Sequence, residues 1–139
     1  MILALKIKLL FGAYAEDDWE GTVEINSSAT LENLHFAIQD ALDFDNDHLY
    51  EFYIARTPRS RERIRFDDEG GEIYSKTIES LYPLADKQCL FYLFDYGDSW
   101  LFKITKNRKS LETDPHVTYP RLVHETGGKP EQYPDWEEE

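Results

Sequence analysis

The chain of 139 residues carries 28 acidic and 15 basic side chains, and its formal net charge is −13. Hydrophobic residues make up 41% of the sequence and aromatic residues 14%, which is enough apolar surface for one domain spanning residues 1–139 and excludes a globally disordered chain. The acid excess argues against binding to duplex nucleic acid, because much of that affinity comes from Lys and Arg contacts with phosphates.

The cysteine count and the apolar runs indicate a compartment. The single cysteine, Cys89, cannot form an internal disulfide, so nothing points to an oxidising environment. Lys6 and Lys8 interrupt the apolar N-terminus too early for a signal peptide, and no run approaches the ~20 apolar residues of a spanning helix. We therefore expect a cytoplasmic protein that makes no membrane contact.

The first predicted elements form a β-hairpin. Apolar residues alternate over positions 3–11, which is the period of a strand with one buried face: Leu3, Leu5, Ile7, Leu9 and Phe11. A second strand is predicted at residues 19–25, where Trp19, Val23 and Ile25 share one parity. We expect these two neighbouring strands to pair.

A helix is predicted over residues 31–42. Thr30 is a suitable N-cap, and Glu32 lies in the first turn, where the helix dipole favours a carboxylate. Five apolar residues fall on one face at helical spacing: Leu31, Leu34, Ile38, Ala41 and Leu42. Gln39 and the other polar residues are expected to lie mostly off that face, and the poor helix formers of residues 43–47 end the helix.

The second half of the chain predicts mainly strands. Tyr50, Phe52 and Ile54 share one side of a strand at residues 49–54. The later predicted elements are a short strand near 64–66, a short helix at 77–81 capped by Thr77, an apolar hairpin of residues 89–94 and 100–104, and a last strand at 117–123. Pro120 restricts that last strand to an edge or a bulge.

These elements predict an α+β fold with a mixed or mainly antiparallel sheet and one principal helix packed on a face. The β-β-α-β order at the start is analogous to a ubiquitin-like opening. The Gly-, Pro- and acid-rich segment 127–139 is expected to dock on the domain through Tyr133 and Trp136, or to be partly flexible.

The turn at residues 94–100 is the first candidate for a functional site. Gly97 supplies conformational freedom and Asp98 suits a turn that bonds its own backbone, but a tight turn does not need two carboxylates flanked by aromatic rings. Asp95 and Asp98 therefore have two interpretations. Both cap the turn, or they form an acidic lip lined by aromatic rings that include Trp100.

The loop after the helix is the second candidate. Asp43, Asp45 and Asp47 alternate as in a calcium loop, but His48 stands where such a loop needs its turn Gly, and Ile54 where it needs its bidentate Glu. A helix C-terminal turn held by Asx side chains is the favoured interpretation, and a metal site completed by residues from elsewhere is the alternative.

Two histidines flank these candidates. His35 lies at the edge of the apolar helix face, and His48 follows the acidic loop. A structural histidine bonded to a carbonyl or an acid is the default interpretation for both. The functional interpretation brings both together with Asp95 or Asp98 around a cation or a substrate proton.

Five arginines form a basic stretch in an otherwise acidic chain: Arg56, Arg59, Arg61, Arg63 and Arg65. They could bind an anion or a nucleic acid, and the preferred interpretation is that they pair with neighbouring acids.

Two long motifs resemble those of the Ri-plasmid ORF-3-like family. The first motif comprises Thr30-Leu31, Leu34-His35, Ile38-Gln39, Phe44-Asp45-Asn46-Asp47-His48-Leu49-Tyr50 and Phe52, and the second comprises Tyr92, Phe94-Asp95-Tyr96-Gly97-Asp98-Ser99-Trp100 and Phe102. The segment with Tyr119-Pro120, Gly127-Gly128 and Pro130-Glu131 is similar to the family's C-terminal part. The resemblance covers nearly the whole chain and implies an α+β fold with an uncharacterised role.

This chain departs from the family pattern in three places. Phe44 stands where a Trp is frequent, Leu101-Phe102 where a His often follows, and Lys129-Pro130-Glu131-Gln132 where the tail commonly reads Pro-Pro-Glu-Asp. Some relatives carry plasmid, transposon or resolvase labels. No serine in a basic setting here supports resolvase chemistry.

The leading hypothesis is a non-enzymatic binding or adaptor domain for an unknown protein or a small polar ligand, with no cofactor. Its polar, aromatic groove is predicted from seven residues: His35, Asp45, Asp47, His48, Asp95, Asp98 and Trp100. One alternative is a hydrolase that uses the same acids and histidines with a divalent metal, and another is a mobile-element-associated protein that binds nucleic acid through its arginines.

Overall fold

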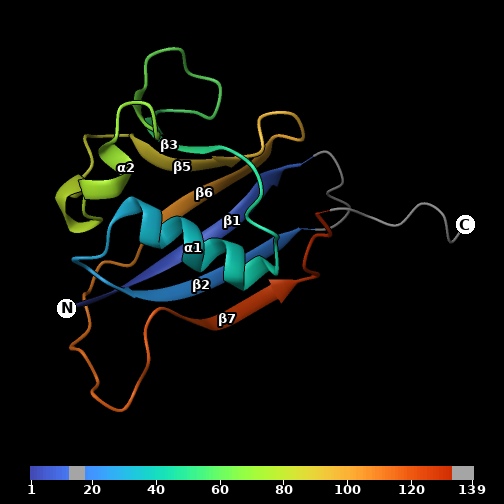
Figure 1. The fold of residues 1–139 in the computed structure, drawn as a ribbon. Helices are drawn as coiled ribbons and strands as arrows, with labels where there is room; N and C mark the ends of the chain where they lie inside the picture. Colours follow the sequence, from blue (N-terminus) through green and yellow to red (C-terminus); the bar gives the residue numbers. More distant parts are fainter. Residues whose placement is uncertain (13–17, 133–139) are drawn as a thin grey trace, which may run out of the picture.

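The computed structural model describes residues 1–12 and 18–132. Seven strands form one antiparallel sheet in the order β4-β3-β5-β6-β1-β2-β7 (Figure 1). The strands are β1 Ile2–Phe11, β2 Trp19–Asn26, β3 Tyr50–Ala55, β4 Ile64–Phe66, β5 Cys89–Phe94, β6 Trp100–Lys106 and β7 Arg121–Gly127. The helices are α1 Leu31–Leu42, the single turn α2 Glu72–Ser75 and the 3₁₀ turn η1 Glu79–Leu81. The predicted mainly antiparallel sheet is therefore confirmed, and the sheet dominates over the short helices.

Helix α1 begins and ends where its sequence predicts. Thr30 Oγ1 accepts a hydrogen bond from the Asn33 backbone N–H at 3.2 Å, and Asn33 Oδ1 accepts one from the Thr30 N–H at 3.1 Å, which satisfies two backbone donors at the N-terminus. The helix ends at Asp43, which adopts the left-handed conformation with φ 58°. Within residues 1–12 and 18–132, no helix has the length and apolar character to cross a membrane.

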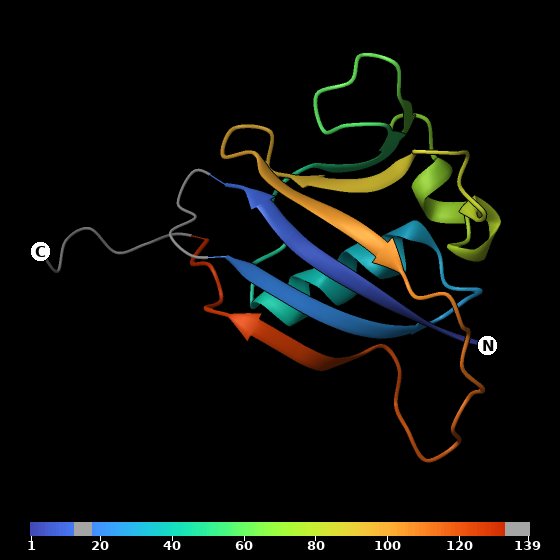
Figure 2. The ribbon, with the colours of Figure 1, turned by 180° about the vertical axis from the view of Figure 1, so that it is seen from behind.

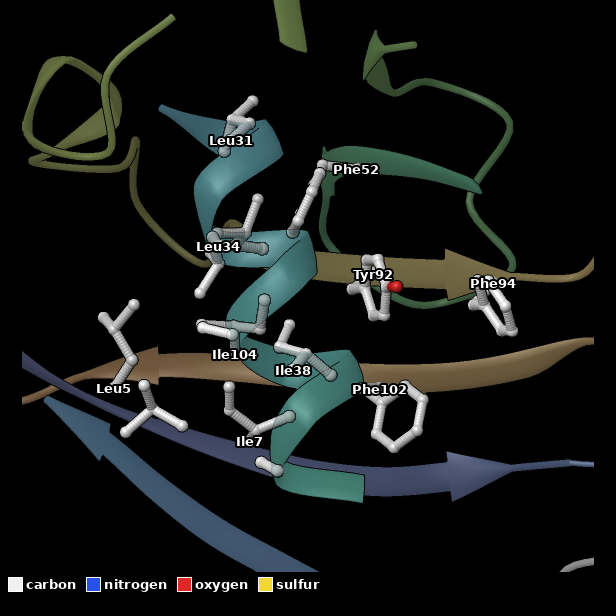
Figure 3. Close-up of a cluster of buried hydrophobic side chains, with 14 of the residues drawn as sticks. Leu5, Ile7, Leu31, Leu34, Ile38, Phe52, Tyr92, Phe94, Phe102 and Ile104 are labelled. Carbon is white, nitrogen blue, oxygen red and sulfur yellow. The ribbon is translucent and has the colours of Figure 1, made fainter. Parts of the chain in front are cut away.

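The main core lies between α1 and one face of the sheet. Leu34 and Ile38 of α1 share a buried cluster with Leu5 and Ile7 of β1 and Phe102 of β6. Figure 3 shows the α1 side chains lying over those of β1, β5 and β6. Figure 2 shows the opposite face of the sheet, which none of the helices in the described part of the chain covers. Strands β1 and β2 pair as predicted, while the ubiquitin-like analogy stays a prediction.

Phe11 corrects the predicted pattern of the first strand. Its side chain is exposed, although Leu3, Leu5, Ile7 and Leu9 are buried as predicted. The pairing of β1 with β6 shifts register between Leu9 and Phe11, and such a shift breaks the alternation of faces.

The second half of the chain differs from prediction at its short elements. The last strand starts at Arg121, directly after Pro120, and pairs with β2 as an edge strand. The turn at 79–81 is 3₁₀ rather than an α-helix from Thr77, and the single turn α2 was not predicted. The expected docking through Tyr133 and Trp136 lies outside the described residues.

The antiparallel register separates two ends of the sheet. At one end, Tyr50 opposes Phe94, and Phe94 opposes Trp100. At the other end, Ala55 opposes Cys89. Because α1 leads directly toward the first end, residues 43–48 are carried to the β5–β6 turn.

Ile38 tests the packing of α1 on the sheet. Its side chain is fully buried, so Ile38→Ala should lower the free energy of unfolding by about 2–5 kcal/mol through lost burial and a residual cavity. Phe36→Ala, at an exposed position of the same helix, is the matched control and should cost less than ~1 kcal/mol. Urea unfolding monitored by tryptophan fluorescence measures both, and equal losses would contradict the packing.

Candidate functional site

The loop after α1 and the β5–β6 turn meet through a polar contact. His48 Nε2 lies 3.4 Å from Asp95 Oδ2 and 3.6 Å from Asp47 Oδ1. The His48 ring also packs edge-on against Phe94. Two segments far apart in the sequence therefore share one surface. We call the surface formed by residues 43–48, 95–98 and 129–132 the loop–turn site.

The two carboxylate oxygens of Asp95 make different contacts. Oδ1 accepts hydrogen bonds from the backbone N–H groups of Gly97 at 3.1 Å and Asp98 at 3.3 Å, while Oδ2 faces His48. Asp95 has φ 61°, a left-handed conformation that Asp tolerates better than most residues. Its own N–H bonds to the carbonyl of Leu49 at 2.9 Å. Asp95 thus shapes the turn and fixes it to the neighbouring loop.

Asp98 lies beside this pair and is half-buried. Partial burial, together with the negative charge of Asp95, raises the pKa of the Asp98 carboxyl group above its usual range.

A third segment, near the C-terminus, binds the same loop. Gln132 Oε1 accepts a hydrogen bond from the Asp45 backbone N–H at 2.7 Å, and Gln132 Nε2 donates to Asp47 Oδ1 at 2.9 Å. Lys129 Nζ lies 3.3 Å from Asp43 Oδ2. Between this segment and the loop is a surface pocket of about 400 Å³, bordered by the carboxylates of Asp43, Asp45 and Glu131.

Beneath the loop, four residues form a closed ring of hydrogen bonds. Gln39 Nε2 donates to Tyr92 Oη at 2.9 Å, and Tyr92 Oη lies 2.5 Å from His35 Nδ1. His35 Nε2 contacts Asn46 Oδ1, and the Asn46 backbone N–H donates to Gln39 Oε1 at 3.1 Å. The ring joins α1, the loop and β5.

The directions of these bonds follow from the one fixed donor. The Asn46 N–H can only donate, so Gln39 Oε1 accepts and Gln39 Nε2 donates. Asn46 Oδ1 can only accept, so His35 carries its proton on Nε2, and its Nδ1 accepts from the Tyr92 hydroxyl. Each of these polar groups in the ring thereby has a partner.

Burial keeps the His35 ring neutral. His35 is 1% exposed, and loss of solvation lowers its pKa from 6.5 to about 4, with the hydrogen bond to Asn46 opposing that shift. The ring is stacked on Tyr50 with centroids 3.5 Å apart. Desolvation, followed by the nearby charge of Glu32, raises the pKa of Tyr50.

Trp100 lies in the core below the turn. The side chain is 0% exposed and packs edge-on against Phe44, with ring centroids 5.1 Å apart. A Cβ added at Gly12 would lie 2.2 Å from the Trp100 ring, so Gly12 allows the β1 end to pack directly on it. Its indole Nε1 is buried and has no hydrogen-bond partner within residues 1–12 and 18–132.

The seven predicted groove residues therefore separate into two groups. At the surface lie Asp45, Asp47 and His48, together with the half-buried Asp98. The other three are buried: Asp95 is 6% exposed at the turn, and His35 and Trp100 lie below it.

Sequence reasoning missed Gln39, Tyr92 and Gln132. Gln39 was expected off the apolar helix face and is 2% exposed, because it lies one turn after His35 and shares its partner Tyr92. A tyrosine in the middle of an apolar strand was the available signal for Tyr92, since a buried hydroxyl needs a partner. No sequence signal identified Gln132.

The acids and histidines of the described chain form no group of three or more with the arrangement of a metal site. The loop at 43–47 is a helix C-terminal turn in which Asp43 and Asn46 both have positive φ.

Two of the five clustered arginines have internal partners. Arg65 lies 2.8 Å from Glu51, and Arg63 donates to the Ser60 carbonyl at 2.8 Å with its guanidinium over the Tyr53 ring. Arg65 is therefore paired with an acid as expected, whereas Arg63 bonds to backbone carbonyls.

Comparisons with known proteins point to one family. The model of the plasmid pRiA4b ORF-3-like protein family matches residues 2–133. The comparison with curated proteins found no match. A crystal structure of a protein of unknown function, MM3350 from Methanosarcina mazei Go1, is similar with TM-score 0.71 and 23% sequence identity, covering 89% of this chain and 68% of that chain. This likeness shows a shared fold.

Because the buried His35 is neutral in the folded protein, the free energy of unfolding should decrease as the pH falls. Its folded-state pKa of about 4 lies below the unfolded value of 6.5, so the unfolded chain binds more protons between these values. The contribution is complete above pH 6.5 and declines toward pH 4 by up to ~3 kcal/mol.

The variant His35→Gln isolates this contribution, because Gln retains a donor and an acceptor but does not titrate. The variant should be less stable than the wild type at pH 7, and urea unfolding should show the difference shrinking between pH 6.5 and 4. A constant difference across this range would contradict the assignment.

Proposed function

This chain belongs to the plasmid pRiA4b ORF-3-like family, and we propose that it acts as a non-enzymatic binding or adaptor domain through the loop–turn site. The observation that carries the proposal is the contact of His48 with Asp95, which makes one continuous surface from two distant segments. The proposed partner is a positively charged segment of another protein.

The charge of the loop–turn site supports a cationic partner. The site has five carboxylates with solvent exposure, Asp43, Asp45, Asp47, Asp98 and Glu131, and the buried carboxylate of Asp95. Lys129 and His48 are its basic side chains, and Lys129 is already paired with Asp43. An acidic rim raises the local concentration of a cationic partner and increases its association rate.

Shape and rigidity also support binding. The pocket of about 400 Å³ beside Asp45 has room for a long side chain such as Lys or Arg. Three contacts hold the loop in place. Asn46 bonds to the buried His35, the Asp95 N–H donates to the Leu49 carbonyl, and Gln132 accepts from the Asp45 N–H. A surface that is already ordered loses less conformational entropy on binding.

The buried position of His35 favours binding over hydrolysis. A general base must come within hydrogen-bonding distance of a substrate proton. Both ring nitrogens of His35 already bond to Tyr92 and Asn46, and the side chain is 1% exposed. His48 remains at the surface, where it is held between two carboxylates.

A hexa-arginine peptide titrated into the isotope-labelled protein tests the proposal. We expect saturable amide shift changes concentrated at residues 43–48, 95–98 and 129–132, with affinity that weakens as salt rises. The double variant Asp45→Asn/Asp98→Asn should weaken binding roughly fivefold, since each solvent-accessible charge contributes about 0.5 kcal/mol.

The matched control is Glu112→Gln, an exposed acid at the other end of the sheet, near Ile2. This variant should leave the peptide affinity within twofold of the wild type. Shift changes spread evenly over all acidic surfaces, or an equal loss in the control, would contradict a specific site.

A further inference from the structure

A second pocket lies at the end of the sheet opposite the loop–turn site. It has a volume of about 410 Å³ and is formed by the end of β6, the start of β5 and the segment before β5. This volume is within the range of pockets that hold small organic molecules. We call it the basic pocket.

The charge of the basic pocket is opposite to that of the chain. Lys103, Lys106 and Arg108 line it, and no lining residue is acidic. This is unexpected in a chain with 28 acidic and 15 basic residues. Within residues 1–12 and 18–132, none of the three cations forms an ion pair. Their charges are therefore not neutralised by ion pairs with the carboxylates of the described residues.

Lys103 is placed beside a second lysine by the sheet register. It lies opposite Lys8 of β1 in the antiparallel pair. Like charges directly opposite each other in adjacent strands repel, and the acid next to this pair, Glu20, lies opposite Lys8 on its far side, in β2.

Tyr82 also lines the basic pocket. Its hydroxyl is buried, and no partner for it exists in the described part of the chain. Desolvation, together with the neighbouring Cys89, raises the pKa of this hydroxyl to about 12, so it remains protonated and able to donate at neutral pH. The Lys106 ammonium lies 5.5 Å from the centroid of the Tyr82 ring.

The remaining walls are largely apolar. Pro83, Leu84 and Ile104 line the same pocket. Cationic side chains next to an apolar wall match a ligand with an anionic head and a hydrocarbon body. We propose that the basic pocket binds a small organic carboxylate with an apolar chain. This inference is independent of the proposed function, because the two sites lie at opposite ends of the sheet.

Calorimetric titration of the full chain with hexanoate tests the proposal. Hexanoate should bind saturably and at least tenfold more tightly than acetate or inorganic phosphate, because the latter two lack an apolar body. Absence of saturable hexanoate binding, or equal affinity for all three anions, would overturn it.

Matched charge variants locate the site. Lys103→Gln/Arg108→Gln removes two cations whose side chains make no hydrogen bond or ion pair elsewhere in the described chain, and it should weaken hexanoate binding at least fivefold. Arg59→Gln/Lys76→Gln makes the same change in net charge outside the pocket and should leave the affinity unchanged. Equal weakening in both would mean non-specific attraction and contradict the pocket.

Tyr82→Phe separates the ligand contact from folding. Because it removes an unsatisfied buried hydroxyl, the variant should be at least as stable as the wild type without ligand. Its affinity for hexanoate should stay within twofold of the wild type, because the hydroxyl has no solvent exposure, and a severalfold loss would contradict binding through the cationic side chains.

Cys89 reports occupancy independently, since it lines the pocket and is the single cysteine of the chain. Hexanoate should slow its alkylation by iodoacetamide at least fivefold in the wild type and leave the rate unchanged in Lys103→Gln/Arg108→Gln. Equal rates with and without hexanoate in the wild type would overturn the site.

Discussion

The closed ring of hydrogen bonds among Gln39, Tyr92, His35 and Asn46 is the constraint on which the loop–turn site depends. It is buried between a helix and a sheet, where a polar group without a partner costs about 1–3 kcal/mol. Because each bond needs the next one in a fixed direction, the ring is satisfied in one arrangement and loses several partners together in any other. A polar network of this kind therefore specifies the position of the loop after α1, which apolar packing alone would leave less defined.

The surface above the ring follows from that position. Once Asn46 is held over His35, the loop presents His48 to Asp95, whose second oxygen organises the β5–β6 turn. The sequence left two interpretations of Asp95, as a cap of the turn or as part of an acidic lip. In the structure, one carboxylate oxygen of Asp95 caps the turn and the other faces His48. The core supports this arrangement from the other side, where Trp100 packs against Phe44 of the same loop.

The predictability of the elements depended on how strongly each sequence pattern is tied to local physics. Helix α1 was predictable to the residue because Thr30 caps it and Leu34 and Ile38 repeat at helical spacing. Phe11 was misplaced because a register shift between paired strands depends on the partner strand, which alternation in one segment does not reveal. The sequence indicated only part of the hydrogen-bonded ring, because a histidine beside an apolar helix face requires a hydrogen-bond partner. It did not identify Tyr92 as that partner, because Tyr92 lies in a strand of otherwise apolar residues. Gln132 could not be predicted, because its contacts arise only after the chain has folded back onto the loop.

The two ends of the sheet are chemically opposite, with carboxylates gathered at the loop–turn site and cations at the basic pocket. The acidic end can act as an ordered binding surface only if the hydrogen-bonded ring holds the loop after α1 in place. The direct test is the tautomer of His35, read from the nitrogen chemical shifts of its ring by NMR at neutral pH. The account predicts a neutral His35 imidazole with the proton on Nε2 and an unprotonated Nδ1 that accepts a hydrogen bond from Tyr92. The Nδ1 signal should therefore change in Tyr92→Phe. A proton on Nδ1, or rapid exchange between both tautomers, would contradict it.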